Sequence, residues 1–195
     1  NLIKNNKKAI NLEMIANHRG SAFGAYRTPQ PSQINFENNL AFSFLNHISD
    51  ILLLEDESKT IGKNYLPKGW YEKMQSSALI IIRAPMEERI NNIYNEYVKI
   101  PITQKKDSAV LCLSLTSSLN KIKKRIGGKL HDEIQKNIKE AFTNNEKTLH
   151  EKWIKKILTN YYDPMYEYQL NRRKDHVSFE GCYDEVIDYI DFNFQ

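Results

Sequence analysis

Short apolar runs alternate with amphipathic segments in the first hundred residues, and this alternation constrains the fold more than any other feature of the sequence. Three apolar runs read as buried strands, at 9–13, 51–54 and 78–85. Three segments repeat apolar residues at helical spacing, at 32–48, 66–75 and 86–98. This order predicts an α/β fold whose sheet is mostly parallel.

After Pro101 the pattern becomes helical, and we expect a second region there. Helical periodicity covers three segments, at 106–126, 129–142 and 147–162. A short returning strand is expected near 176–179, with a closing helix after Gly181. We therefore predict an α/β domain over 1–100 and a mainly helical subdomain over 101–195. Residues 1–8 read as the end of a helix.

The composition is typical of a globular domain, with 41% hydrophobic and 27% charged residues. No apolar run approaches the roughly 20 residues that cross a bilayer, and no signal peptide pattern opens the sequence. We therefore expect a cytoplasmic protein without a membrane partner. Cys112 and Cys182 lie far apart and lack metal-ligand spacing, so neither a disulfide framework nor a zinc site is predicted.

Three consecutive carboxylates, Glu55, Asp56 and Glu57, follow the second apolar run. Acids at the carboxyl end of a parallel strand suit Mg²⁺, because this hard cation prefers oxygen ligands. Alternatively, Lys59 and Lys63 pair with these acids as a charged cap on the strand. Taken alone, the pattern favours the cap, and it leaves the magnesium site open.

The segment NHRGSAFG (17–24) follows the first predicted strand and carries groups that bind anions. His18, Arg19 and Ser21 offer polar side chains, and Gly20 allows close approach of the backbone to a phosphate or diphosphate. In a parallel sheet this loop shares an edge with the three carboxylates and with two further cations, Lys59 and Arg83. The alternative is a surface turn, with Arg83 in an exposed salt bridge.

A basic segment and a tyrosine-rich segment follow in the helical region. Cations bind nucleic-acid phosphates, and tyrosine rings stack on unpaired bases. The segment YYDPMYEYQLNRR (161–173) supplies the tyrosines. The candidate tRNA-binding cations are Lys121, Lys123, Lys124, Arg125, Lys129, Arg172 and Arg173. The alternative is a solvated helix face beside tyrosines that pack against one another.

Five segments, in the same order along the chain, closely resemble the C-terminal domain of bacterial tRNA 2-selenouridine synthases. They read NLEMIANHRGSAFGAYRTPQPSQINFENNLAF, LLLEDESKTIGKNYLP, IIIRAPMEERI, KRIGGKLHDEI and YYDPMYEYQLNRR. The resemblance extends from about residue 9 to about residue 181. It implies a P-loop NTPase-like domain that lacks two parts of the family pattern, the Walker A loop and the rhodanese-like domain with its catalytic cysteine.

The resemblance also implies an activity. The family converts wobble 2-thiouridine of tRNA into 2-selenouridine through an S-geranyl intermediate, with geranyl diphosphate and selenophosphate as co-substrates. In this reading the chain supplies anion and tRNA binding, and its partners are tRNA, the rhodanese-like domain and the supplier of selenophosphate. We expect the chain alone to be inactive.

Two other functions stay open. The chain could be a non-catalytic half of a split or degraded enzyme that holds tRNA or a partner. It could also be a small-molecule kinase of the P-loop class, although that reading does not explain the 17–24 loop and the 161–173 segment together.

Overall fold

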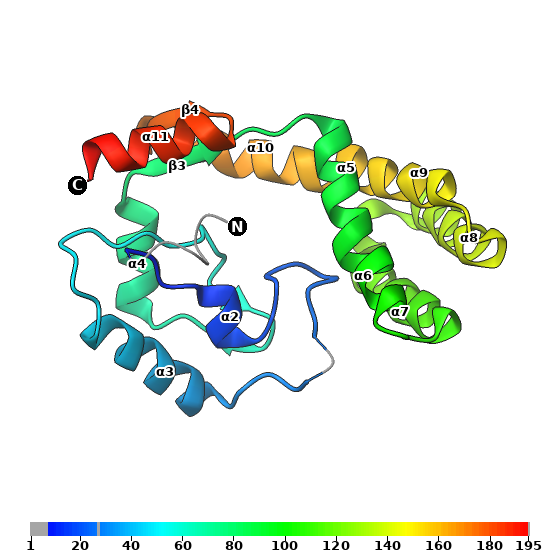
Figure 1. The fold of residues 1–195 in the computed structure, drawn as a ribbon, viewed down its shortest axis with the longest axis horizontal. Coiled ribbons are helices and arrows are strands. Elements are labelled where there is room, and N and C mark those ends of the chain that lie inside the picture. The colour runs from blue at the N-terminus through cyan, green and yellow to red at the C-terminus, as the bar shows by residue number, and fades with distance from the viewer. Residues whose placement is uncertain (1–7, 27, 195) are drawn as a thin grey trace. The chain divides into compact units, whose positions relative to one another are not determined.

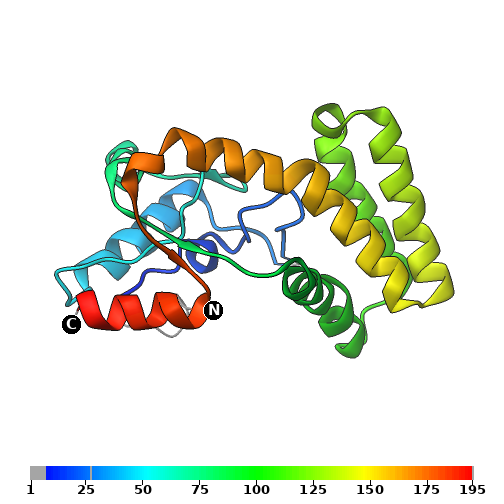
Figure 2. The ribbon, with the colours of Figure 1, turned by 90° about the horizontal axis from the view of Figure 1, so that it is seen from above.

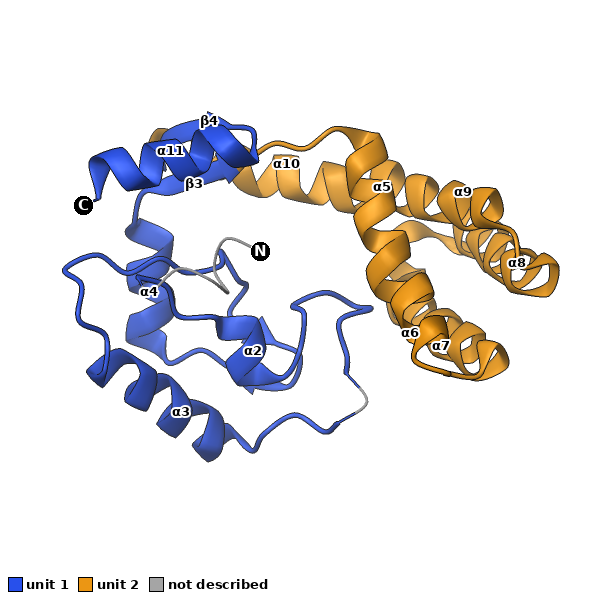
Figure 3. Cartoon of the chain, viewed as in Figure 1, with its two compact units in different colours: residues 1–81, 176–195 blue, residues 82–175 orange. Residues whose placement is uncertain are grey.

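The computed structural model describes residues 8–26 and 28–194, and the chain divides into two compact units (Figure 3). Unit 1 comprises residues 1–81 and 176–195, and unit 2 comprises residues 82–175. This division differs from the predicted boundary at residue 100. The helix at 86–94 packs on another helix of unit 2, and the C-terminal strand returns to unit 1. The helical end of residues 1–8 lies outside the described residues, except for Lys8.

Unit 1 is built from short elements around one apolar core (Figure 1). Its helices are α2 (Leu12–Ala16), α3 (Gln33–Leu45) and α4 (Lys68–Ser76), and a hairpin joins β1 (Thr60–Ile61) to β2 (Asn64–Tyr65). β1 and β2 pair antiparallel. The buried members of the core are Ile10, Leu12, Ala16, Phe36, Leu40, Ile61, Leu66 and Met74.

The strand predicted over 9–13 is wrong for most of its length. Asn11 caps a helix there, because its side chain accepts a hydrogen bond from the backbone of Met14 at 2.6 Å. Only Ala9 keeps a strand-like contact, a parallel bridge to Leu53. Around it, the backbone N–H of Ile10 donates to Leu53 O at 3.1 Å, and that of Leu53 donates to Lys8 O at 2.9 Å. The predicted strands at 9–13 and 51–54 thus meet in parallel at one point.

The helices predicted at 32–48 and 66–75 are present. Ser32 caps α3 as expected, accepting from the backbone of Asn35 at 3.2 Å. The apolar stripe of α3 is buried only in part. Phe36 and Leu40 lie in the core, whereas Phe44 is 50% exposed against Trp70, and Ile48, beyond the helix, is 93% exposed.

A second small sheet joins distant parts of the chain. β3 (Leu79–Ile82) pairs with β4 (Val177–Gly181), which confirms the expected returning strand, and α11 (Tyr183–Asn193) follows as the closing helix. The fold is α/β and mostly helical. Its described strands form two two-stranded sheets instead of the one mostly parallel sheet that the sequence predicted.

Unit 2 is helical (Figure 2). α8 packs against both α7 and α9, and α5 packs against α9. Its elements, in chain order, are α5 (Met86–Tyr94), η1 (Asn95–Lys99), α6 (Ile100–Thr103), α7 (Ser108–Ile126), α8 (Gly128–Asn144), α9 (Lys147–Ile157), η2 (Leu158–Tyr162), α10 (Asp163–Arg172) and η3 (Lys174–His176).

Two π-helical turns in unit 2 each precede a proline. η1 leads into Pro101, and η2 leads into Pro164. A proline inside a helix lacks an N–H and crowds the carbonyl four residues earlier. The wider π turn relieves this conflict, since the backbone N–H of Ile100 donates to Asn95 O and that of Asp163 donates to Leu158 O. Both helices therefore continue through their prolines.

Candidate functional site

The structure brings the 17–24 loop and the three carboxylates together in unit 1. Gly20 has φ +67°, and a Cβ atom built on it would lie 2.5 Å from Oε1 of Glu57. A side chain at position 20 would thus collide with this carboxylate. The predicted meeting of the two segments is present, and the positive φ of Gly20 favours glycine at this position.

Glu57 is the most perturbed acid of this cluster. Burial, together with the nearby charges of Glu13, Glu55 and Asp56, raises the pKa of its carboxyl group to about 7. Glu57 is also hydrogen-bonded to the side chain of Glu13. Glu57 is therefore largely protonated below about pH 7, and its protonated form can donate the hydrogen bond to the carboxyl group of Glu13.

Glu55 has a structural role at the start of α2. Its Oε2 accepts the backbone N–H of Leu12 at 2.9 Å, which satisfies one of the free donors at the helix N-terminus. Its Oε1 is buried without a hydrogen-bond partner among the residues that the structure describes. Burial raises the pKa of Glu55, and the bond from Leu12 opposes this rise.

The 17–24 loop uses much of its backbone internally. The N–H groups of Arg19 and Gly24 donate to Gly24 O and Ser21 O, each at 2.9 Å, and that of Ser21 donates to Arg19 O at 2.7 Å. The Ser21 hydroxyl accepts the backbone N–H of Phe23 at 3.3 Å. An anion at this loop would therefore depend on side chains more than on the backbone.

The predicted anion-binding side chains are placed differently from one another. His18 is 8% exposed, and its backbone N–H donates to Glu13 O. The guanidinium of Arg19 lies 4.4 Å from the ring centroid of Tyr26, a cation–π contact. Lys59 is exposed beside the acid segment in sequence. Arg83 belongs to unit 2.

Within residues 8–26 and 28–194, no group of three or more His, Cys, Asp or Glu side chains is arranged to hold a metal ion. Asp56 is exposed, the carboxyl group of Glu55 accepts the backbone N–H of Leu12, and that of Glu57 lies against Gly20 and is hydrogen-bonded to Glu13. A magnesium ion at Glu55, Asp56 and Glu57 would require these side chains to turn toward one another.

In unit 2 the basic segment spans the junction of α7 and α8. Gly127 takes φ +81° at this junction, which a side chain would strain. The backbone around it turns the chain so that the last turn of α7 and the first turn of α8 are adjacent in sequence and in space. All five predicted cations here are exposed: Lys121, Lys123, Lys124, Arg125 and Lys129.

Two of the predicted cations contact tyrosines of the 161–173 segment. Arg125 donates to the hydroxyl of Tyr161 at 3.1 Å, and Arg172 lies 5.9 Å from the ring centroid of Tyr168. Arg172 and Tyr161 are separated by about 16 Å along the helix axis, at 1.5 Å per residue. Arg172 and Arg173 therefore form a group apart from the α7–α8 cations.

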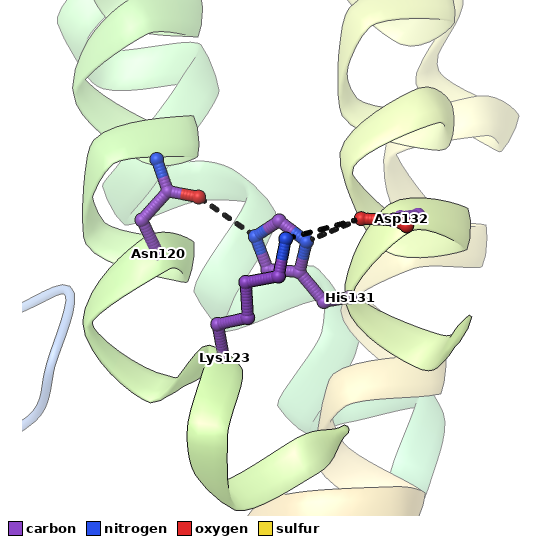
Figure 4. A network of polar contacts seen from close by, with 4 residues as sticks. All are labelled: Asn120, Lys123, His131 and Asp132. Carbon is purple, nitrogen blue, oxygen red and sulfur yellow. Dashed lines mark hydrogen bonds and ion pairs between the residues drawn. The ribbon is translucent and has the colours of Figure 1, made fainter. Parts of the chain in front are cut away.

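A buried histidine fixes the α7–α8 junction, and sequence analysis did not single it out (Figure 4). His131 is 2% exposed; its Nε2 lies 2.7 Å from Oδ1 of Asn120 on α7, and its Nδ1 lies 2.8 Å from Oδ1 of Asp132. Lys123 pairs with the same Asp132 oxygen at 3.7 Å. The hydrogen bond to His131 lowers the pKa of Asp132. The sequence signal was available, since His131 lies at helical spacing from the buried residues Ile134 and Ile138 of α8.

A polar network that sequence analysis also missed holds the long loop between α2 and α3. Gln30 Nε2 donates to Ala16 O and to Ile61 O, each at 2.9 Å, and its Oε1 accepts the backbone N–H of Lys63 at 2.9 Å. Asn17, in the left-handed conformation, donates to Thr28 O at 3.0 Å. The loop is thus ordered by side-chain bonds to α2 and to the β1–β2 hairpin.

The family described as "tRNA 2-selenouridine synthase AAA domain" matches residues 1–195. The tRNA 2-selenouridine synthase of Shewanella sediminis is 41% identical to this chain in a match that covers 94% of the chain. The enzyme of Shewanella loihica is 39% identical in a match that covers 95% of the chain. The tRNA 2-selenouridine synthase of Shewanella denitrificans is 41% identical to 94% of the chain.

In each of these three relatives the match covers 54% of the relative's length, so the chain spans about half of the curated relatives it matches. No solved structure matches the chain. Among the described helices, none combines the length and the apolar character that crossing a membrane requires.

Proposed function

The chain belongs to the family of tRNA 2-selenouridine synthase AAA domains, and from this membership we propose that it forms the tRNA- and anion-binding part of an enzyme that converts wobble 2-thiouridine into 2-selenouridine. The observation that carries the proposal is the family match over residues 1–195. The P-loop NTPase-like character of unit 1 is part of the same proposal.

Unit 2 supplies the tRNA-binding surface in this proposal. Five exposed cations gather at the α7–α8 junction, and Tyr161 lies beside them through its bond to Arg125. Exposed lysine and arginine side chains bind phosphates by releasing counterions, so affinity should fall steeply with salt. The tyrosines of η2 and α10 offer ring faces for unpaired bases.

An electrophoretic mobility shift with tRNA tests this surface. Changing Lys121, Lys124 and Lys129 to alanine should weaken binding by roughly ten-fold or more and should lower the salt slope by about one unit per lost phosphate contact. The matched control changes three other exposed lysines, Lys68, Lys99 and Lys136, to alanine. Equal affinities of the two triple variants would remove the surface from the proposal.

Unit 1 supplies anion binding in this proposal. Geranyl diphosphate and selenophosphate are the proposed co-substrates, and both carry phosphate oxygens that pair with guanidinium and ammonium groups. The proposed contacts in unit 1 are His18, Arg19, Gly20, Ser21 and Lys59, and Arg83, in unit 2, stays a separate candidate. Arg19 is the most informative of them, because its backbone is fixed by two loop bonds while its side chain rests on Tyr26.

Arg19→Ala should weaken the binding of geranyl diphosphate, measured by isothermal titration calorimetry, by at least roughly ten-fold if a charge-assisted contact is lost. Lys63→Ala is the control, since Lys63 is an exposed cation in the same unit. Unchanged affinity in the Arg19 variant would exclude the loop as the diphosphate site.

Magnesium binding at Glu55, Asp56 and Glu57 is also proposed for this site, and it requires that these side chains turn toward one another. Glu57 is largely protonated below about pH 7, so a bound Mg²⁺ would release that proton. Calorimetric titration of Mg²⁺ in two buffers of different ionisation enthalpy measures this release. A binding enthalpy that does not depend on the buffer would argue against these ligands.

One observation favours a second candidate, a binding module without chemistry. The loop backbone is bonded internally, and a carboxylate lies against Gly20 where an anion would approach. Mass spectrometry of tRNA nucleosides discriminates the two, using cells that lack the complete gene and then regain it. Return of 2-selenouridine supports the enzyme. The modification should not return when the regained gene carries alanine in place of Lys121, Lys124 and Lys129.

A further inference from the structure

Helix α3 carries apolar residues on two opposite sides. α3 packs against α2 and β2 (Figure 1), and its inner side carries Phe36 and Leu40, which are buried in the core of unit 1. Ile34 and Leu45 lie about 160° and 180° around the helix axis from Phe36, at 3.6 residues per turn. They are 70% and 81% exposed. Apolar residues on opposite sides are typical of a buried helix, so the outer side of α3 is a surface for a partner.

The outer side of α3 has the spacing of a coiled-coil seam. Four of its residues recur at intervals of four, three and four, which are the d, a, d and a positions of a heptad: Ile34, Asn38, Ala41 and Leu45. Ile48 takes the next d position in the sequence, just beyond the helix, and is 93% exposed. This spacing keeps one row of side chains toward a neighbouring helix along the whole of α3. It therefore indicates a helix as the partner.

The outer side of α3 also carries almost no charge. Among the 13 residues of α3 only Glu37 is charged, although 27% of the residues of the whole chain are. A surface without cations does not suit a nucleic acid, whose phosphates attract lysine and arginine. Few charges and exposed aromatic rings, such as that of Phe42 at 70% exposed, are typical of the core of a protein–protein interface. The partner is thus an uncharged helix of a protein.

Asn38 distinguishes between possible partner helices. Against an apolar helix, its amide would be buried without hydrogen bonds, which is costly. Against a second α3 in parallel register, Asn38 meets Asn38, and the two amides can hydrogen-bond to each other. The same register pairs Ile34 with Ile34 and Leu45 with Leu45. It also places Glu37, at a g position, opposite Phe42, at an e position, so that no like charges face each other.

We propose that α3 of a second copy of this chain covers the outer side of α3 in parallel register, so that the protein forms a dimer with two-fold symmetry. The seam is about four turns of helix long. It belongs to the small end of specific interfaces, and we expect a dissociation constant in the micromolar range. This inference does not rest on the proposed function.

Sedimentation velocity of the full-length protein that carries this chain tests the inference. Asn38→Lys should raise the dissociation constant of the dimer by at least roughly 100-fold, because it places two ammonium groups opposite each other in the seam. Asn39→Lys is the matched control, since Asn39 is exposed on α3 outside the seam, and it should leave the constant unchanged. A protein that stays monomeric up to about 100 μM, or equal constants for the two variants, would overturn the proposal.

Cysteine cross-linking tests the register in the same protein, with Cys182 changed to serine because its thiol is exposed. After oxidation by copper phenanthroline, Asn38→Cys should form a disulfide between two copies, and Asn39→Cys should not. Cross-linking of both variants, or of neither, would contradict a parallel pair of α3 helices. A monomer in which Asn38→Cys resists alkylation would mean that another part of the same protein covers α3, and this result would also overturn the proposal.

Discussion

The two units of the chain satisfy their buried groups in opposite ways. Unit 2 packs helix on helix, and its two buried histidines both have partners, since His150 accepts the indole N–H of Trp153 at 3.1 Å. Unit 1 crowds the carboxyl groups of Glu13 and Glu57 together and leaves Glu55 Oε1 buried without a partner among the described residues. Helix-on-helix packing thus leaves the buried histidines of unit 2 paired, whereas the short elements of unit 1 leave its buried carboxyl groups strained by burial and by one another.

The same contrast appears in the two most perturbed titratable groups. His150 lies among Tyr94, Phe142 and Trp153, and burial lowers its pKa to about 4. Burial and neighbouring acids raise the pKa of Glu57 to about 7. Acid should therefore weaken unit 2, and alkali should weaken unit 1. Each unit has one tryptophan, Trp153 in unit 2 and Trp70 in unit 1, so fluorescence can follow them separately.

The largest expected effect comes from a cavity in the closed core of unit 2. Ile138→Ala on α8, at a fully buried site, should lower the free energy of unfolding by about 3 to 4 kcal/mol. Leu54→Ala in unit 1 should cost only about 1 to 2 kcal/mol, because this side chain is half-buried beside an existing pocket. Urea unfolding followed by fluorescence measures both.

The control for this pair is Leu113→Ala, at a site that is 69% exposed on α7, which should change stability by less than about 0.5 kcal/mol. Equal losses at Ile138 and Leu54 would contradict the contrast between a closed and an open core.

The contrast also explains which parts of the fold were predictable from sequence. In unit 2, helices at 106–126, 129–142 and 147–162 follow from periodicity, because a helix is specified by local spacing. The π turns before Pro101 and Pro164 were missed, since a proline in a sequence usually indicates the end of a helix. In unit 1, the run at 9–13 looked like a strand, and the cap at Asn11 with the bond from Leu12 to Glu55 makes it a helix.

For the candidate site, the sequence predicted that the 17–24 loop meets the carboxylates at 55–57, but it did not predict the contacts of the individual side chains. The order of strands and acids was enough to bring Gly20 beside Glu57. The role of Glu55 at Leu12 and the contact of Glu13 with Glu57 depend on pairs distant in sequence. No local pattern encodes such pairs.

Lowering the pH should reduce the stability of unit 2 through His150. Its pKa is depressed in the folded state, so the folded protein binds fewer protons than the unfolded chain between about pH 6.5 and pH 4. The stability of unit 2 should be complete above pH 6.5 and should fall by about 3 kcal/mol as the pH drops to 4. His150→Gln keeps a neutral acceptor for Trp153 and should flatten this fall, measured by urea unfolding in a Trp70→Phe background. An unchanged acid slope would exclude His150 as its source.

Raising the pH should reduce the stability of unit 1 through Glu57. Its pKa is raised in the folded state, so stability is complete below about pH 4.5 and is lost as the pH rises through 7. Glu57→Gln should remove this loss and stabilise unit 1 by about 1 to 2 kcal/mol at pH 8, a value reduced for partial exposure. The signal is Trp70 fluorescence in a Trp153→Phe background. Glu72→Gln, at an exposed site of α4, is the control and should leave the pH profile as it is.

The smallest expected effect comes from Tyr161 at the α7–α8 junction, where two variants distinguish a role in stability from a role in tRNA binding. Tyr161→Phe removes the hydroxyl that accepts from Arg125 at 3.1 Å, and because this contact is exposed, stability should fall by less than about 1 kcal/mol. The ring that would stack on a base is kept, and the guanidinium is released for phosphate. tRNA affinity should therefore change by less than about two-fold, whereas Tyr161→Ala should weaken binding by about 1 to 3 kcal/mol, the range for a lost base-stacking contact. Equal affinities for the two variants would mean that Tyr161 packs only against the protein.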